Sequence, residues 1–161
     1  MEAKPLVRLR FMWPGKTKNK DLRSLQDQYL EKISRLESCS LVETQEARGL
    51  TERASEKILE IEARGLEKHL SNDYIICLFD GGREMTSEEL AAFLEKASRE
   101  SGPAVTFIVG GFLGLADRIG RQARLRLSLS KMTMSHELCR VVLLEQVYRS
   151  LTIMKGKHYA K

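Results

Sequence analysis

Two short loops in the last third of the chain have the composition expected of a nucleoside-binding site. The first, Val109–Gly114, is rich in glycine and directly follows an apolar run. Glycine has no Cβ, so a ligand can approach the backbone closely. The second loop, Leu129–Met134, follows another apolar run and offers the hydroxyl groups of Ser130 and Thr133. If both runs are parallel strands, the loops meet at one edge of the sheet and form two sides of a pocket.

The glycine-rich loop is compatible with more than one role. Taken alone, it fits an ordinary tight turn between a strand and a helix equally well. It is not a GxGxxG fingerprint, because Val109 and Phe112 interrupt the pattern, and no GxxxxGK[ST] motif occurs. The sequence therefore gives little support to a dinucleotide or triphosphate site.

His136, Arg140 and Tyr159 are the side chains best suited to act on a bound substrate. His136 lies beside a predicted helix start, and Arg140, four residues later, lies on the same helix face. A lone histidine is more often structural than catalytic. No second ligand stands at metal-binding spacing, so we predict no metal site. Tyr159 belongs to the basic tail Lys155–Lys161, a kind of segment that is often a frayed terminus.

These residues depend on a framework of alternating strands and helices. Period-two and continuous apolar patterns predict strands, and apolar spacings of three and four predict helices. We expect strands at Leu6–Trp13, Ser40–Thr44, Tyr74–Phe79, Val105–Val109 and Leu125–Leu129. We expect helices from Asn19 or Asp21 to Leu36, from Thr51 to Leu70, and at Ser87–Ser98, Leu115–Ala123 and Glu137–Met154. This order predicts an α/β fold with a mainly parallel sheet and helices on both faces.

Composition limits the class of protein. The chain has 161 residues, of which 42% are hydrophobic and 30% charged, as expected of a single soluble domain spanning residues 1–161. No apolar run approaches the roughly 18 residues of a membrane span, and no signal-peptide pattern is present. Three cysteines without a CxxC motif indicate reduced thiols, so we expect a cytoplasmic protein. The net charge of +5 permits binding to a polyanion without establishing it.

The chain contains an ordered set of motifs: a strand, GGxxG-Leu, Ser-Leu-Ser-x-x-Thr-x-x-His-x-Leu-x-Arg, and Leu-x-Glu-Gln-x-Tyr-Arg. This order resembles that of the RlmH-type SPOUT methyltransferases, which methylate N3 of a pseudouridine in large-subunit (23S) ribosomal RNA. The likeness covers essentially the whole chain and is strongest from Val105 to Tyr159. Its residues are Gly110, Gly111, Gly114, Leu115, Ser128, Leu129, Ser130, Thr133, His136, Leu138, Arg140, Glu145, Gln146, Tyr148 and Arg149.

The resemblance implies a fold, a cofactor and partners. It implies a SPOUT fold with a C-terminal trefoil knot, a cytoplasmic homodimer, S-adenosyl-L-methionine as cofactor and ribosomal RNA as substrate. The tail would reach the partner's active site, with Arg140, His136 and Tyr159 orienting or deprotonating the base. The implied cofactor-binding residues are Leu78, Gly110, Leu129, Ser130, Lys131, Met132, Thr133 and Met134.

This chain also departs from the family pattern at two places. Phe112-Leu113 stands where Pro-Glu is usual between the glycines, and in the tail His158 replaces a proline and Ala160 a histidine. A non-catalytic RNA- or ribosome-binding protein with the same fold is therefore an alternative. A generic doubly wound nucleotide-binding domain is a third.

Overall fold

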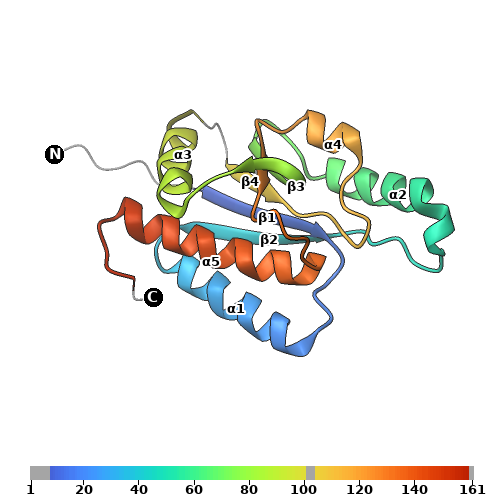
Figure 1. The fold of residues 1–161 in the computed structure, drawn as a ribbon, viewed down its shortest axis with the longest axis horizontal. Coiled ribbons are helices and arrows are strands. Elements are labelled where there is room, and N and C mark those ends of the chain that lie inside the picture. Colours follow the sequence, from blue (N-terminus) through green and yellow to red (C-terminus); the bar gives the residue numbers. More distant parts are fainter. Residues whose placement is uncertain (1–7, 101–103, 160–161) are drawn as a thin grey trace.

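All five strands form one parallel sheet in the computed structural model, which describes residues 8–100 and 104–159 (Figure 1). The sheet order is β2-β1-β4-β3-β5. The strands are β1 (Arg8–Pro14), β2 (Ser38–Thr44), β3 (Tyr74–Glu84), β4 (Val105–Ile108) and β5 (Leu125–Ser128). The connecting helices are α1 (Lys20–Ser34), α2 (Ser55–Glu67), α3 (Ser87–Glu100), α4 (Asp117–Arg121) and α5 (His136–Met154). Every strand therefore points its carboxyl end at the same edge.

Helices cover both faces of the sheet and create two hydrophobic cores. Alternate side chains of β1 take part in each, with Phe11 in the larger core and Met12 in the smaller. The larger core packs the sheet against α1, α3 and α5, and the smaller packs it against α2 and α4 (Figure 1). The predicted α/β class is confirmed. The trefoil knot implied by the resemblance stays a prediction, because strand order and register do not test it.

The structure changes several predicted boundaries. The strand predicted to end at Phe79 continues to Glu84 after a bulge, where Leu78 and Arg83 both pair with Leu127 of β5. The predicted helix start at Thr51 is followed by a 3-10 turn, Glu52–Ala54, before α2 begins. Residues 6 and 7 of the first predicted strand lie outside the described residues.

Apolar spacing and burial differ in two helices. Leu25 lies on the apolar stripe of α1, yet 40% of its surface is exposed. In α2, Ile58 and Ile61 are only half-buried, and the helix buries Glu62, Ala63, Gly65 and Leu66 instead. No helix in the described part of the chain is long and apolar enough to cross a bilayer.

Candidate functional site

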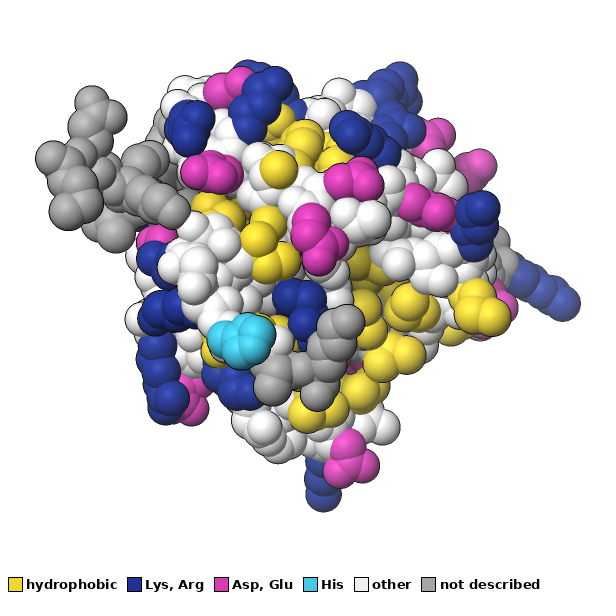
Figure 2. Space-filling view, turned by 60° about the vertical axis from the view of Figure 1, so that its left-hand side comes forward, with side chains coloured by type: hydrophobic (Ala, Val, Ile, Leu, Met, Phe, Trp, Pro, Cys, Tyr) yellow, Lys and Arg dark blue, Asp and Glu magenta, His cyan; other side chains and the backbone are white. Residues whose placement is uncertain are grey.

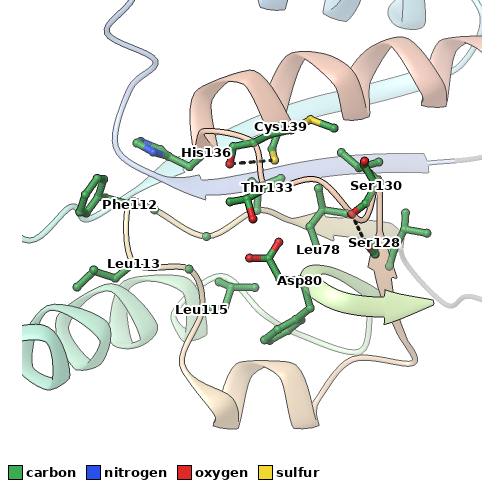
Figure 3. Close-up of a pocket in the computed structure, with 18 of the residues that line it drawn as sticks. Leu78, Asp80, Phe112, Leu113, Leu115, Ser128, Ser130, Thr133, His136 and Cys139 are labelled. Atoms are coloured by element: carbon green, nitrogen blue, oxygen red, sulfur yellow. Dashed lines mark hydrogen bonds between the residues drawn. The ribbon is translucent and has the colours of Figure 1, made fainter. Parts of the chain in front are cut away.

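A cavity of about 420 Å³ opens at the edge where β4 and β5 end, beside the middle of β3 (Figure 3). This size is within the range of small-molecule sites, roughly 300–1,000 Å³. Its lining comes from three chain segments and the start of α5. They are Leu78–Asp80, Val109–Leu115 and the loop after β5, together with His136 and Cys139. The two loops singled out in the sequence therefore do meet.

The glycine-rich loop is a tight turn with no room for side chains at its base. Gly114 donates its backbone N–H to Gly111 O at 3.0 Å and has a φ of +80°, which favours glycine. A Cβ on Gly110 would lie 2.5 Å from the carbonyl oxygen of Gly114. The glycine at position 110 is therefore required by the close approach of the loop to itself.

The loop after β5 is shaped by its own serines. Ser128 Oγ donates to Ser130 O at 2.8 Å, and Ser130 Oγ accepts from the backbone N–H of Met132 at 2.9 Å. The Ser130 hydroxyl thus holds the turn. The cavity is lined by every implied cofactor-binding residue except Lys131: Leu78, Gly110, Leu129, Ser130, Met132, Thr133 and Met134.

His136 lines the side of the cavity away from Leu78 and Ser130, next to Phe112 (Figure 3). Its ring meets that of Phe112 edge to face, with centroids 6.4 Å apart. Burial lowers the pKa of His136 below its usual value, and the positive charge of Arg140 lowers it further. The imidazole is therefore neutral near pH 7 and can accept a proton.

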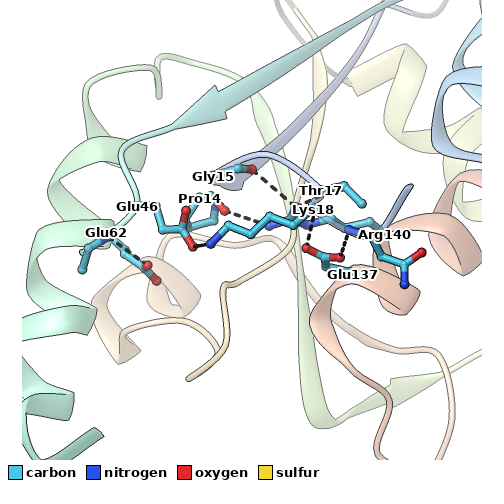
Figure 4. A network of polar contacts seen from close by, with 10 residues as sticks. Pro14, Gly15, Thr17, Lys18, Glu46, Glu62, Glu137 and Arg140 are labelled. Carbon is cyan, nitrogen blue, oxygen red and sulfur yellow. Dashed lines mark hydrogen bonds and ion pairs between the residues drawn. The ribbon is translucent and has the colours of Figure 1, made fainter. Parts of the chain in front are cut away.

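Arg140, expected to share a substrate-facing surface with His136, points elsewhere. Only 1% of its surface is exposed, and it does not line the cavity. Its guanidinium donates to Pro14 O at 2.7 Å and Thr17 Oγ1 at 3.0 Å, and lies 5.0 Å from the Trp13 ring centroid (Figure 4). Burial lowers the pKa of Arg140 to about 10, so it stays charged. The Arg140 side chain therefore does not face the cavity of its own chain, and its role in the site stays a prediction.

Tyr159 lies at the other end of α5 and does not line the cavity of its own chain. Its ring meets Tyr148 edge to face at 5.0 Å, and the Arg149 guanidinium lies 4.3 Å from its centroid. Burial, a hydrogen bond with Tyr29 and the nearby Glu145 raise the pKa of Tyr159 to about 12. Tyr159 thus packs against α5 as a neutral phenol.

The structure adds two residues that the sequence did not single out. Asp80 is exposed, and its carboxylate is directed toward the cavity near Thr133 (Figure 3). The sequence could have indicated Asp80, because it directly follows the apolar run Tyr74–Phe79, where a binding site at the sheet edge is expected. Cys139 also lines the cavity, but burial raises the pKa of its thiol, so it is not a reactive nucleophile.

The sequence profile of a family described as "Predicted SPOUT methyltransferase" matches residues 7–160. The chain belongs to the SPOUT methyltransferase family. Its relatives include two proteins named "Ribosomal RNA large subunit methyltransferase H". The one from Maridesulfovibrio salexigens is 36% identical over 155 residues, covering 96% of this chain and 98% of the relative. The one from Clostridium beijerinckii is 37% identical over 151 residues, covering 91% and 95%.

A solved structure agrees with this SPOUT fold. The "Probable Methyltransferase from Bordetella pertussis Tohama I" has a TM-score of 0.52 and covers 90% of this chain and 95% of its own. Only 10% of the sequence is identical, so the likeness concerns the fold alone. The SPOUT assignment thus agrees with the motif order in the sequence.

Proposed function

We propose that this SPOUT methyltransferase transfers a methyl group from S-adenosylmethionine to N3 of a pseudouridine in large-subunit ribosomal RNA. The observation that carries the proposal is the meeting of the two family loops around one cavity, with a neutral histidine at its rim. The names of the relatives support ribosomal RNA as the substrate. Because the proposed substrate is part of the ribosome, we expect the protein to act in the cytoplasm.

The cavity lining fits the cofactor. Leu78, Leu115 and Leu129 provide apolar surface for an adenine ring, and the glycine turn leaves backbone open to close approach. The Asp80 carboxylate and Thr133 hydroxyl have no hydrogen-bond partner among the described residues, so they are free to bind the ribose hydroxyls. The proposal includes no metal ion and therefore assigns no side chains as metal ligands.

Bound S-adenosylmethionine supplies an electrophilic methyl group on a sulfonium. The chain's own task is to place the base and remove the proton from its N3. The neutral imidazole of His136 would accept that proton, which leaves the lone pair of N3 free to take the methyl group from the cofactor's sulfur. Arg140 contributes indirectly, since its positive charge keeps the pKa of His136 low and its hydrogen bonds fix the chain at Pro14 and Thr17.

The homodimer belongs to the same proposal. Leu25 of α1 and Leu138 of α5 are large apolar side chains left 40% and 39% exposed. Figure 2 shows hydrophobic side chains gathered on the right of the face, on the side of the molecule that carries α1 and α5. Tyr159 is distant from its own cavity, so a partner's cavity is the site at which the tail would act.

Light scattering at micromolar concentration is expected to give twice the mass of one chain. Burial of an apolar surface between copies is the physical reason. Replacing Leu25 and Leu138 with glutamate is expected to shift the protein to monomer, because both substitutions place charge in the contact. A wild-type monomer that still methylates ribosomes would rule out the dimer and the shared site together.

Gly110→Ala is expected to weaken S-adenosylmethionine binding at least about tenfold, or about 1.4 kcal/mol. The added Cβ would meet the carbonyl oxygen of Gly114 at 2.5 Å and force the turn apart. Isothermal calorimetry measures the affinity of the wild type and of the variant. Gly49→Ala is the control for backbone strain alone, because its φ of +71° disfavours alanine while Gly49 has open space around it and lies outside the cavity.

The melting temperatures of the wild type and both variants show whether each remains folded. Unchanged affinity in folded Gly110→Ala would mean that this loop does not border the cofactor. If the wild type itself does not bind S-adenosylmethionine, the proposed function is wrong.

A further inference from the structure

A second cavity, of about 580 Å³, lies where β1 and β2 end, at the same edge of the sheet as the first. Four cations line it, namely Lys16, Lys18, Arg23 and Arg48, against the two carboxylates of Glu43 and Glu46. Lys16 and Lys18 follow β1, Arg23 lies in the first turn of α1, and Arg48 follows β2. In the sequence, Lys16, Lys18 and Arg23 are separate candidates for phosphate contacts, each more often a solvated surface charge, and the fold gathers them with Arg48.

One of the four cations in this cavity has an ion-pair partner among the described residues, and the other three do not. The Lys18 ammonium donates to Glu46 Oε1 at 3.0 Å, which neutralises one carboxylate (Figure 4). Lys16, Arg23 and Arg48 are exposed and have no ion-pair partner in the part of the chain that the structure describes. Thr44 also lines the cavity, and its Oγ1 is buried without a hydrogen-bond partner, as is Oε2 of Glu46. The cavity thus presents three unpaired cations and an unsatisfied hydroxyl against the carboxylates of Glu43 and Glu46, an excess of positive charge that suits an oxyanion.

This cavity is fixed in position relative to the first. Glu137, next to His136, accepts hydrogen bonds from the backbone N–H of Lys18 at 2.8 Å and Asn19 at 3.0 Å (Figure 4). Burial alone would raise the pKa of Glu137, but these two bonds lower it below its usual value. Arg140 ties the same loop to α5 through Pro14 and Thr17. The loop that carries Lys16 and Lys18 is therefore attached to the helix that carries His136.

We infer that the second cavity binds backbone phosphates of the RNA strand that delivers the target nucleotide to the first. The inference rests on the proposed function and adds the residues that hold the substrate strand. Lys16, Arg23 and Arg48 neutralise phosphates, and the link through Glu137 sets their distance from His136. This cradle of cations supplies affinity and register for the RNA, while the chemistry stays at the first cavity.

The test is a triple variant, Lys16→Gln with Arg23→Gln and Arg48→Gln, measured for equilibrium binding to unmodified ribosomes at several salt concentrations. Loss of phosphate contacts is expected to weaken binding about tenfold or more near physiological salt, and to lower the slope of log affinity against log salt by about two to three. Cofactor affinity is expected to stay within about twofold, because none of the three residues lines the first cavity.

The matched control removes the same charge from the opposite edge, with Arg8→Gln, Arg35→Gln and Lys96→Gln. Arg8 begins β1, Arg35 follows α1 and Lys96 lies near the end of α3. Little change in the salt slope is expected. Glu43→Gln tests the opposite sign, because removing a carboxylate from the cradle is expected to tighten binding.

Two results would overturn the inference. One is wild-type affinity and salt slope in the cradle variant, and the other is an equal loss in the control, which would indicate only long-range attraction. Methyl transfer by the wild type is measured separately. If the wild type transfers no methyl group, the proposed function is wrong. The binding comparison would then still show whether Lys16, Arg23 and Arg48 bind RNA phosphates.

Discussion

His136→Gln is expected to lower single-turnover methyl transfer to unmodified ribosomes by about 10²–10⁴-fold, the usual contribution of a general base. The amide keeps part of the shape and hydrogen bonding of the imidazole but cannot accept the N3 proton. Cofactor affinity is expected to change little, because His136 lines the side of the cavity away from Leu78 and Ser130. His69→Gln is the control, since His69 is exposed and remote from the cavity.

The pH profile separates a base from a merely structural histidine. Burial lowers the pKa of His136, so the neutral, active form persists at pH values where a free histidine, with a pKa near 6.5, is protonated. The wild-type rate is expected to stay level as the pH falls through that value and to drop only below it. His136→Gln is expected to lack this acid limb. A variant with the wild-type rate and profile would remove His136 from the chemistry.

Deleting residues 157–161 is expected to reduce methyl transfer about 100-fold or more, because a misplaced base loses the benefit of orientation. Folding is expected to survive. The deletion loses the contacts of Tyr159 with Tyr148 and Arg149, worth about 1–3 kcal/mol together, while both cores stay intact. Tyr159→Phe separates the hydroxyl from the ring, since it keeps both ring contacts.

Mixed dimers test whether the tail acts on the partner. A chain with His136→Gln and a full tail is mixed with a chain that has His136 and no tail. If the tail acts across the dimer, the mixed species contains one complete site and recovers activity that neither parent has. No recovery would mean that the tail serves its own chain, and wild-type transfer by the truncated protein would mean that it is not needed.

The fold and the cavity were predictable from sequence because they depend on local patterns. Apolar runs marked β3, β4 and β5 as buried strands, and their order brought the glycine loop and the Leu129–Met134 loop to one edge. Both loops use main-chain groups, so their positions follow from the strands that precede them. This is why the residues implied to bind the cofactor, except Lys131, line one cavity, while their contact with the cofactor stays a prediction.

Arg140 shows where local reasoning fails. Its spacing from His136 placed both on one helix face, but a buried guanidinium goes to whichever carbonyl groups the tertiary fold leaves unsatisfied. Those are Pro14 O and Gly15 O at the end of β1, more than a hundred residues away in sequence.

The central claim is tested most directly by mapping the product. The purified protein is incubated with S-adenosylmethionine carrying a labelled methyl group and ribosomes that lack the modification, and the ribosomal RNA is analysed by nuclease digestion and mass spectrometry. The account predicts a single labelled nucleoside in large-subunit RNA, with the methyl on N3 of a pseudouridine. Label on another atom or nucleoside, or no label in RNA from protein that binds the cofactor, would contradict it.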